Sequence, residues 1–208
     1  EQRYECKLIL SDDGLQHYAL ARDIEIAVVD GQRGLGNGRL LPLGPLREPA
    51  SRLNEVDFVV INGELECTLP ELTVPVFKLF LQPGLLHNLY SGQTLSCAEF
   101  LQLYPGKVHA LAGIGNPERF FSTLTAQGFA IITHVFTDHH KFRAADVAFK
   151  DMRPVVMTEK DAVKCGKFAD DSCWYLSVDA ILPEGLMPLL LDKLQANHKA
   201  DHNTKPQR

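Results

Sequence analysis

The sequence predicts an α/β protein in which short strands alternate with helices around mainly parallel sheets. Short apolar runs rich in Val and Ile recur along the chain, as the buried strands of parallel sheets do. Apolar residues at helical spacing, preceded by capping residues, separate the later runs. A proline-punctuated stretch, residues 68–104, shows no pattern of a long helix. These observations indicate two α/β lobes joined by an extended connection.

The first lobe is expected to contain three strands, at residues 5–11, 24–29 and 58–61, each a short apolar run. A long loop, residues 31–49, separates the second strand from the third and holds five glycines and three prolines. A loop longer than about 12–15 residues in a compact domain is usually functional or disordered. This loop is therefore a candidate part of a site.

The connection is expected to be a ribbon of two extended segments, VPVFKLFLQP and LLHNLYSG. The second lobe follows it, and its first helix is expected to begin at Pro117, with Asn116 as N-cap, and to end before Gly128. The polar tail from Gln195 is expected to be mobile. The other expected elements of this lobe are strands at 108–114, 131–136, 155–157 and 174–178 and helices at 144–150 and 186–194.

Composition limits the classes of function. The chain has 208 residues, of which 45% are hydrophobic, so it can bury a sizeable core. Its formal net charge of −5 gives no support for general binding to nucleic acid or to anionic membranes. Five scattered cysteines without a CxxC pair indicate reduced thiols, and no apolar run reaches the length of a membrane span. Because the chain begins at Glu1 just ahead of an expected strand, we expect a fragment whose N-terminal part is missing.

The stretch SDDGLQH, residues 11–17, places Asp12 and Asp13 where the first expected strand ends. One interpretation is that Asp13 caps a helical turn that begins at Gly14. The other is that an aspartate at the end of the strand helps to hold Mg²⁺, since hard cations favour carboxylate oxygens. The two interpretations are compatible, with one aspartate for each.

The glycine-rich loop carries three arginines, Arg33, Arg39 and Arg47, whose forked guanidinium groups are suited to phosphate. Its glycines would let the backbone approach a ligand closely. The alternative is a solvated loop in which Arg47 and the neighbouring Glu48 form a surface ion pair. The loop alone does not decide between these interpretations.

Two polar stretches follow expected strands of the second lobe. In TDHH, residues 137–140, His139 is a candidate proton relay or electrostatic partner, whereas a zinc site would need ligands at better spacing. In TEKD, residues 158–161, Thr158 and Asp161 resemble a capping box, and Lys160 near the helix N-terminus is a candidate anion contact.

The stretch GIGNP, residues 113–117, suggests a dinucleotide site but lacks the third glycine of GxGxxG. The chain contains no GxxxxGK[ST] motif. A nucleotide-dependent enzyme with a Rossmann-like fold, using Gly113 and Gly115, therefore has weak support from the residues. Tight binding of a dinucleotide would distinguish this alternative.

Taken in order, the stretches SDDGLQH, VVDGQRGLGNGRLLPLGPLREP, AGIGNPERFF, FTDHH and MTEKDAVKC resemble those of the tetraacyldisaccharide 4′-kinase (lipid A 4′-kinase) family. The resemblance covers the chain from Cys6 to about Leu194. It implies phosphorylation of the 4′-hydroxyl of a tetraacylated glucosamine disaccharide 1-phosphate, with ATP and Mg²⁺, to give lipid IVA. The reaction would take place at the cytoplasmic side of the Gram-negative inner membrane.

The resemblance also implies an architecture. Residues 1–70 would be the remainder of a P-loop kinase-like parallel-sheet domain, and residues 71–105 a two-stranded ribbon linker. Residues 106–195 would form a smaller Rossmann-like α/β domain, followed by a flexible tail at 196–208. The P-loop, a catalytic aspartate and a membrane-contacting helix of the family would all precede Glu1. The chain alone is therefore expected to be inactive.

The resemblance assigns roles residue by residue. Asp12 and Asp13 match the acidic pair associated with Mg²⁺, and Gln16 and His17 match the substrate-proximal continuation of that motif. Arg47 and Glu48 match the REP segment beside the reacting phosphates. His139 matches a histidine that pairs with the catalytic aspartate. Arg39 and Lys160 complete the expected substrate-binding residues.

A second class of function stays open, a non-catalytic α/β protein that binds a glycolipid or a nucleotide. It predicts that the coding sequence upstream of Glu1 encodes no P-loop, whereas the kinase interpretation requires one. The upstream sequence would therefore distinguish an enzyme from a binding protein.

Overall fold

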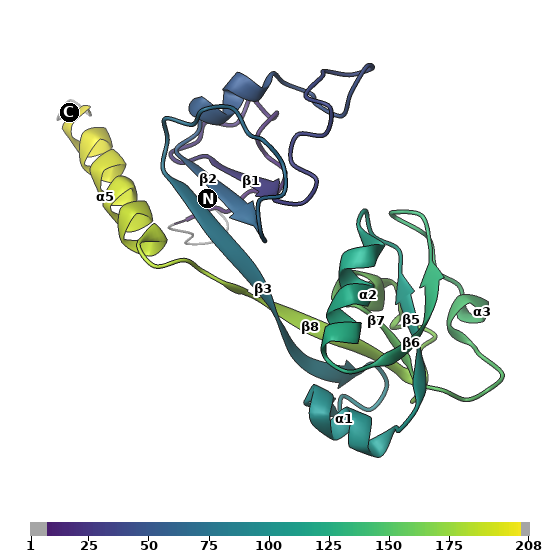
Figure 1. Cartoon of the computed structure of the whole chain (residues 1–208). Coiled ribbons are helices and arrows are strands. Elements are labelled where there is room, and N and C mark those ends of the chain that lie inside the picture. Colours follow the sequence, from purple (N-terminus) through teal and green to yellow (C-terminus); the bar gives the residue numbers. More distant parts are fainter. Residues whose placement is uncertain (1–7, 205–208) are drawn as a thin grey trace. The chain divides into compact units, whose positions relative to one another are not determined.

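The structure is a computed structural model that describes residues 8–204. The chain divides into two compact α/β units (Figure 1), unit 1 with residues 1–80 and 181–208 and unit 2 with residues 81–180. Strands β3 (Val76–Asn88) and β8 (Cys173–Ile181) each have residues in both units and are neighbours in the sheet. The predicted α/β class, with mainly parallel strands, is confirmed.

Both segments that were expected to form the ribbon contribute to one continuous strand, β3, which runs through Pro83 and Gly84. Its long-range neighbour is β8, which lies far along the sequence. A short strand, β4 (Thr94–Leu95), also pairs with β3, in antiparallel orientation. Sequence spacing alone could not reveal that β8 returns to this strand.

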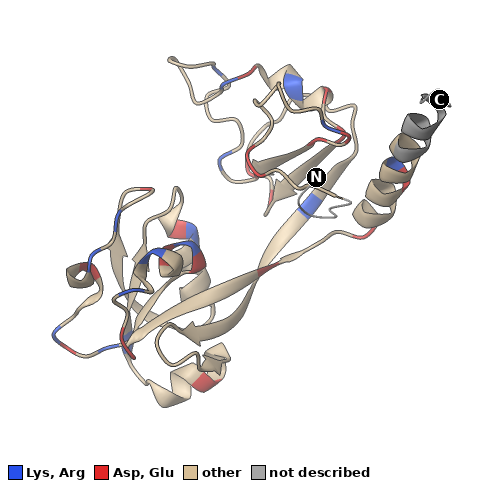
Figure 2. Cartoon of the chain, turned by 180° about the vertical axis from the view of Figure 1, so that it is seen from behind, with Lys and Arg blue, Asp and Glu red and all other residues tan. Residues whose placement is uncertain are grey.

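Acidic and basic residues are interspersed over both units (Figure 2). In the part of the chain that the structure describes, neither sign of charge is confined to one unit. Within the part of the chain that the structure describes, no helix combines the length and the apolar character needed to cross a membrane.

Unit 1 is built on parallel strands β1 (Ile26–Asp30), β2 (Phe58–Asn62) and the first part of β3. Side chains alternate between the two faces of these strands. One face carries Ala27, Val29, Val59 and Ile61 and packs against leucines of the loops. A short 3₁₀ helix, η1 (Ala50–Asn54), which was not predicted, leads into β2.

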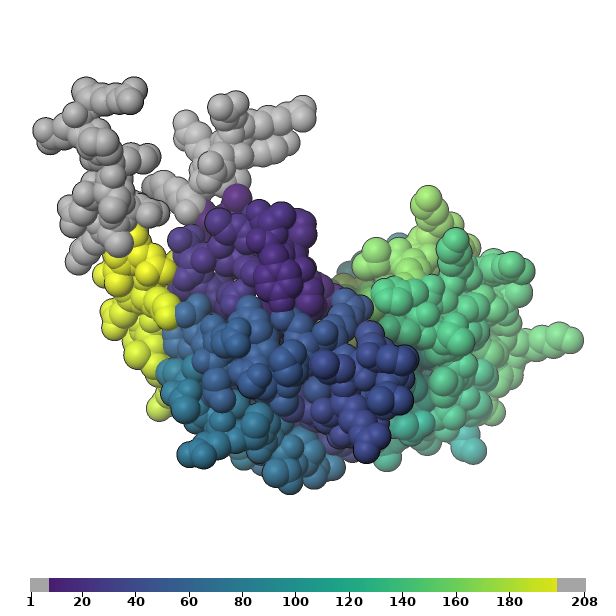
Figure 3. All heavy atoms as spheres, turned by 90° about the horizontal axis from the view of Figure 1, so that it is seen from above, coloured from purple at the N-terminus to yellow at the C-terminus, as the bar shows by residue number. Residues whose placement is uncertain are grey.

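Helix α5 (Leu186–Thr204) packs on the opposite face of unit 1, and its first residues, yellow in Figure 3, lie against other atoms of that unit. Leu186 packs with Phe58 and Val60, and Lys193 forms an ion pair with Asp57. The contacts therefore group residues 181–208 with unit 1, whereas the expected boundaries placed residues up to 195 with the second lobe.

Helix α5 extends well past Leu194, where the sequence was expected to leave the helix. Residues 196–204 are therefore helical, while residues 205–208 lie outside the described part, and the flexibility of the tail stays a prediction. Residues 195–204 contain neither Gly nor Pro, and most of them tolerate a helix. Polarity alone was therefore a poor guide to where the helix ends.

The expected strand at residues 5–11 is absent at residues 8–11, and residues 5–7 lie outside the described part. Leu8, Ile9 and Leu10 are 56%, 66% and 87% exposed. A strand needs a neighbour to satisfy its backbone N–H and C=O groups. Among the described strands β1 ends the sheet and pairs only with β2, so residues 8–11 have no such neighbour.

Unit 2 is a parallel sheet with helices on both faces. Strands β5 (Lys107–Ala112), β6 (Ala130–Val135), β7 (Val155–Thr158) and β8 lie in the order β8-β7-β5-β6. Helices α1 (Cys97–Leu103) and α2 (Pro117–Ala126) pack on one face, and α3 (Ala144–Val147) and α4 (Glu159–Cys165) pack on the other. This arrangement matches the Rossmann-like expectation in its layers.

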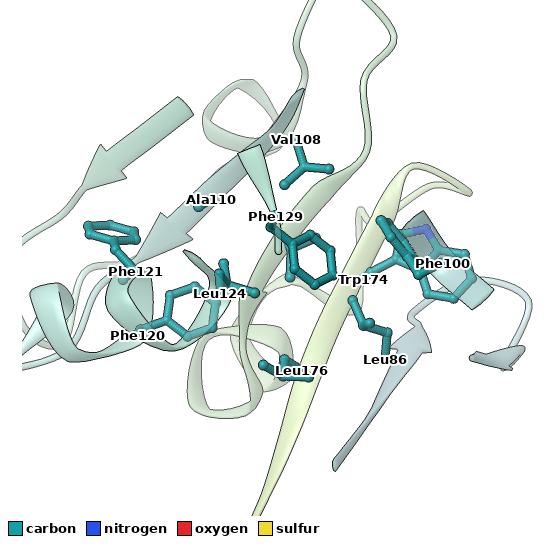
Figure 4. Close-up of a cluster of buried hydrophobic side chains, with 12 residues drawn as sticks. Leu86, Phe100, Val108, Ala110, Phe120, Phe121, Leu124, Phe129, Trp174 and Leu176 are labelled. Atoms are coloured by element: carbon teal, nitrogen blue, oxygen red, sulfur yellow. The ribbon is translucent and has the colours of Figure 1, made fainter. Parts of the chain in front are cut away.

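The first face holds the largest core of the molecule (Figure 4). Trp174 of β8 lies edge-on to Phe100 of α1, with ring centroids 5.2 Å apart. Leu124 of α2 is fully buried against the same group of side chains. Aromatic pairs of this geometry add to the burial of their apolar area, so they fix α1 and α2 on the sheet.

Helix α2 confirms the predicted start and stop. Asn116 is the N-cap and accepts a hydrogen bond from the backbone N–H of Arg119, and Pro117 is the first helical residue. Gly128, with φ of 91°, follows the helix in the left-handed conformation. Helix α1 was not predicted, although Ser96 and Glu99 form a capping box at its start.

The buried carboxylate of Asp161 ties together three segments of unit 2. The side chain is fully buried, and its Oδ2 accepts hydrogen bonds from Gly113 N and Thr158 Oγ1, both at 2.8 Å. Its Oδ1 lies 2.9 Å from Lys164 Nζ. The Thr158 hydroxyl in turn caps α4 by accepting from Asp161 N. Thr158 is therefore the N-cap of α4, as expected, whereas the Asp161 side chain does not complete a capping box and instead accepts from Gly113 of the GIGNP turn.

We predict that Asp161→Ala lowers the free energy of unfolding by about 3–5 kcal/mol, because it leaves the Lys164 ammonium and two donors without their acceptor. Urea unfolding followed by circular dichroism would measure this change. Glu159→Ala is the matched control, since Glu159 is exposed in the same first turn. A loss for Asp161→Ala no larger than for the control would show that the carboxylate is not needed for the fold.

Met152 holds a strained backbone conformation, with φ of 55°, on a side chain that is 86% exposed. Its neighbours keep the turn in place. Asp151 lies 2.9 Å from the buried ring of His109 and 2.8 Å from Arg153. Left-handed conformations of bulky residues persist only where the surroundings impose them.

Met152→Gly is expected to raise the free energy of unfolding by about 0.5–1 kcal/mol, because Gly adopts a positive φ without strain. Thermal unfolding of the variant would test this. Lys150→Gly, at an exposed position of the same turn whose φ is not positive, should have the opposite effect. Destabilisation by both substitutions would mean that the turn carries no strain.

Candidate functional site

The SDDGLQH stretch forms an exposed bend and turn in unit 1. Asp12 and Asp13 are both exposed, and Asp13 has φ of 52°. No helix begins at Gly14, because residues 14–20 form consecutive turns. The helix-cap interpretation of Asp13 is therefore wrong. Asp residues tolerate the left-handed region better than most, so the backbone here favours a short polar side chain.

Arg22 stabilises this turn through hydrogen bonds to its backbone. Its Nη1 donates hydrogen bonds to the carbonyl oxygens of Gly14, at 2.7 Å, and Leu15, at 2.9 Å. The guanidinium also lies 5.8 Å from the ring centre of Tyr18. One side chain thus binds the two consecutive peptide groups that precede Gln16.

Glu48 of the REP segment binds the same turn from the other side. Its carboxylate accepts a hydrogen bond from Gln16 Nε2 at 2.7 Å and another from the Tyr18 hydroxyl. These hydrogen bonds, from Tyr18 first and then Gln16, hold the pKa of Glu48 below its ordinary value. The same bond to Glu48 raises the pKa of Tyr18. SDDGLQH and REP, which the sequence separates by some thirty residues, are therefore joined through one carboxylate.

One alternative was a surface ion pair between Arg47 and Glu48. The structure, which describes both residues, does not contain that ion pair. The cationic partner of Glu48 is Arg52, whose Nε lies 3.6 Å from Glu48 Oε1. Arg52 also donates to Glu25 Oε2 at 2.7 Å, and Glu25 Oε1 lies 2.9 Å from Arg22 Nε. Arg22, Glu25 and Arg52 were missed by the sequence analysis. Their i,i+3 and i,i+4 spacings are visible in the sequence, but the link between the two pairs is tertiary.

The glycines of the loop at residues 31–49 serve packing within the chain. A side chain at Gly31 would meet the carbonyl oxygen of Glu64, and one at Gly44 would meet that of Arg39. The loop begins with Asp30, whose Oδ1 accepts from the N–H groups of Gln32 and Arg33. The expectation that these glycines serve the approach of a ligand has no support at Gly31 or Gly44. Residue 38 alone among the loop glycines has open space around it.

The three loop arginines are available for a ligand. Arg33, Arg39 and Arg47 are exposed, and among the described residues none of their guanidinium groups has an ion-pair partner. These three arginines thus differ from Arg22 and Arg52, which are half-buried and form ion pairs with Glu25 and Glu48. Free guanidinium groups on an ordered loop suit phosphate recognition.

In unit 2, Asp138 brings His139 and Lys160 together at the carboxyl ends of β6 and β7. Lys160 Nζ lies 3.4 Å from Asp138 Oδ1, and His139 Nε2 lies 3.7 Å from Asp138 Oδ2. Burial acts to raise the pKa of Asp138, but the backbone N–H of His139 and the Lys160 ammonium outweigh it and lower the pKa. His139 is 79% exposed and has φ of 60°, so its ring is accessible and its backbone is strained.

His140 differs from His139 in every respect. Its Nε2 lies 3.2 Å from Asp146 Oδ2, and its ring packs against Phe136 and Phe142. Adjacent histidines of the DHH stretch therefore point to different surroundings, one to solvent and one to the core. The structure gives His140 a packing role.

Side chains of the protein itself occupy the space beside the GIGNP turn. The N–H of Gly113 donates to Asp161, and a side chain at Gly113 would meet Phe142 at 3.1 Å. The close approach that this glycine allows is therefore to Phe142 and Asp161. The dinucleotide interpretation depended on a close approach of a ligand to this glycine, and Gly113 instead contacts the protein.

The donor set at Asp12 and Asp13 fits a hard cation. Both carboxylates are exposed, and no described side chain neutralises them. Mg²⁺ commonly binds through one or two carboxylates and retains several waters. Among the described residues, no cluster of three or more His, Cys, Asp or Glu side chains could hold a metal by itself. The two aspartates therefore suit a cation whose remaining ligands are phosphate oxygens and water. They do not by themselves supply enough ligands for a complete metal site.

The structure joins four of the sequence-predicted site residues in two pairs, one in each unit. Gln16 and Glu48 are in direct contact in unit 1, near His17 and the Asp pair in sequence. His139 and Lys160 share Asp138 in unit 2. Arg39 and Arg47 contact neither group through a hydrogen bond or ion pair among the described residues.

Comparison with known proteins shows the family to which the chain is similar. Residues 1–195 match the family model described as tetraacyldisaccharide-1-P 4′-kinase. A tetraacyldisaccharide 4′-kinase of Alcanivorax borkumensis is 51% identical over 192 residues, which are 92% of this chain and 56% of that protein. Its counterpart in Dechloromonas aromatica is 50% identical over 94% of this chain and 58% of its own length.

A solved structure gives the same result at the level of fold. The crystal structure of LpxK from Aquifex aeolicus in complex with ATP has a TM-score of 0.66 and 26% sequence identity, and the match covers 87% of this chain and 56% of that one. The chain thus spans somewhat more than half the length of the relatives it matches. Since the family model covers nearly the whole chain, the chain belongs to the tetraacyldisaccharide-1-P 4′-kinase family.

Proposed function

We propose that the full-length protein containing this chain transfers the γ-phosphoryl group of ATP to the 4′-hydroxyl of a tetraacyldisaccharide 1-phosphate, giving lipid IVA. The observation that carries this proposal is the family match over residues 1–195. The junction of the SDDGLQH and REP segments through Glu48 supports it, because both segments belong to the motif set of the family.

Phosphoryl transfer depends on positioning and on neutralising charge, so the roles divide by chemistry. Asp12 and Asp13 would hold Mg²⁺, which supplies charge neutralisation at the phosphates when bound. Arg47, exposed and unpaired among the described residues, would stabilise charge on the transferring group. Glu48 would act beside it by fixing the turn, since its carboxylate already accepts from Gln16 and Tyr18.

The remaining roles concern the substrate. Gln16 and His17 would contact the disaccharide, and Arg39 and Lys160 would contact its anionic groups. His139 would support a carboxylate base that takes the proton of the 4′-hydroxyl. The exposure of its ring, which lies 3.7 Å from Asp138, supports that role, because the ring is accessible to another group.

The site of action would be the cytoplasmic side of the Gram-negative inner membrane, where a tetraacylated substrate resides. The protein would associate with that surface peripherally or through an N-terminal anchor outside this chain. Four acyl chains would keep the substrate in the bilayer, so the enzyme must work at the membrane surface.

The direct test is a kinase assay with the full-length protein, [γ-³²P]ATP, Mg²⁺ and the tetraacylated disaccharide 1-phosphate in mixed micelles. Labelled product that requires both Mg²⁺ and a free 4′-hydroxyl is expected. Binding of the glycolipid without transfer, by protein shown to bind ATP, would favour the alternative of a non-catalytic binding protein.

Asp13→Asn is expected to lower kcat at least 100-fold and to weaken the Mg²⁺ dependence of the rate. Asn tolerates the left-handed backbone as Asp does, so the substitution removes only the charge. The change in unfolding free energy should stay within about 0.5 kcal/mol, as for other exposed positions. Asp23→Asn, an exposed carboxylate in the same unit, is the control and should leave kcat unchanged. Normal turnover of Asp13→Asn would remove Asp13 from the cation site.

His139→Asn and His140→Asn are predicted to separate activity from stability. His139→Asn should lower kcat by about 10²–10⁴-fold, the range of a positioned acid–base partner, with little change in melting temperature. His140→Asn should mainly lower the melting temperature, because it removes the contact with Asp146 and the packing on Phe142. Steady-state kinetics and thermal unfolding of both variants would decide. Equal losses of kcat in the two variants would contradict the assignment.

A further inference from the structure

We propose that Arg22, Glu25 and Arg52 are positioning residues for the phosphoryl transfer. They form a relay of ion pairs that holds the SDDGLQH turn and Glu48 in one arrangement. The inference rests on the proposed function and extends it to three side chains outside the motifs that carry the family resemblance.

Glu25 is the centre of the relay because it bridges the two arginines. Its Oε2 accepts from Arg52 Nη2 at 2.7 Å, and its Oε1 lies 2.9 Å from Arg22 Nε. The hydrogen bond to Glu25 is the main reason why the pKa of Arg52 is raised. Oε1 is withdrawn from water and has no hydrogen bond of good geometry, so its ion pair with Arg22 is its compensation.

Each arginine then holds one of the two segments. Arg22 donates to the carbonyl oxygens of Gly14 and Leu15 and so fixes the turn. Arg52 lies 3.6 Å from Glu48 and so fixes the REP segment. Gln16, which belongs to the same turn as Gly14 and Leu15, donates a hydrogen bond to Glu48. The contacts therefore form a closed ring, which runs from the turn through Arg22, Glu25, Arg52 and Glu48 and back to the turn.

The charged side chains of the ring are largely shielded from solvent. They are 14% to 19% exposed and alternate in sign, Arg22, Glu25, Arg52 and Glu48. Partly buried pairs are screened less by salt than surface pairs are, and the loss of one partner leaves the others uncompensated. Replacing Glu25 by a neutral residue would leave two guanidinium groups facing each other through a weaker acceptor.

Candidate site residues adjoin the ring in sequence. Asp12, Asp13 and His17 flank Gly14 and Leu15, whose carbonyl oxygens Arg22 binds, and Arg47 precedes Glu48, which lies beside Arg52. Catalytic constellations lose rate when they are displaced by about 1 Å, even if the fold survives. We therefore expect the ring to act on rate through geometry.

Glu25→Gln in the full-length protein is the central experiment, and Glu55→Gln is its matched control. Glu55 also contacts Arg52, at 3.8 Å, but it is 67% exposed and is not part of the ring. Kinetics should show kcat at least tenfold lower for Glu25→Gln with the KM for ATP changed less than twofold. Glu55→Gln should stay within twofold of the wild type in both constants.

A second readout is independent of activity. Hydrogen exchange of the full-length protein should show faster exchange, by about tenfold, for amides 14–20 in Glu25→Gln. The β5 amides of unit 2, residues 107–112, should be unchanged and serve as the internal reference. Unchanged exchange at residues 14–20 would overturn the proposal, whether or not the protein is a kinase. An inactive wild type with the expected exchange result would overturn the proposed function and leave the ring intact.

Arg22→Lys guards against a variant that fails to fold. Lys keeps the charge toward Glu25 but lacks the fork that reaches two carbonyl oxygens and a carboxylate together. It should reproduce the faster exchange of amides 14–20 and the loss of kcat. Wild-type kcat in Arg22→Lys, or equal acceleration of exchange in residues 14–20 and 107–112, would mean that the ring serves only global stability and would contradict the proposal.

Discussion

A carboxylate withdrawn from water must be met by donors and cations, and this constraint organises the loops of both units. In unit 2 the fully buried Asp161 collects Gly113, Thr158 and Lys164 and so locks the turns that follow two strands. In unit 1 the shielded carboxylates of Glu25 and Glu48 perform the same task for segments that lie far apart in sequence. The strands supply the frame in each unit, while these carboxylates decide where the loops lie.

The same pairing determines which charges stay available. The cations that hold the loops, Arg22, Arg52 and Lys164, are occupied by internal partners. The arginines of the glycine-rich loop and the Asp12–Asp13 pair are exposed without such partners among the described residues. Exposed charges without internal partners suit an anionic substrate and a hard cation, because a ligand can bind them without breaking an existing ion pair.

Strain and exposure coincide at two positions that the proposal uses. Asp13 and His139 are exposed residues with positive φ, held where an unconstrained chain would rarely place them. Each lies within a stretch of the family motif set, Asp13 in SDDGLQH and His139 in FTDHH. Such outliers favour a functional explanation when the chemistry of the side chain also suits one. At Met152 the chemistry does not suit one, and the turn around Asp151 suffices as the cause.

The sequence by itself determined the α/β class, most of the strands, the limits of α2 and the capping of α4 by Thr158, because these depend on local periodicity and on short-range hydrogen bonds. The order of the motifs also sufficed to indicate the family. Only the tertiary structure decided that β8 pairs with β3, that α5 packs on unit 1, and that Glu48 binds Gln16 and Tyr18 rather than Arg47. The strand expected at residues 5–11 failed at residues 8–11 for the same reason, since a strand exists only beside a partner. Pairings between distant segments depend on how the chain folds back on itself, and no local pattern of residues records that.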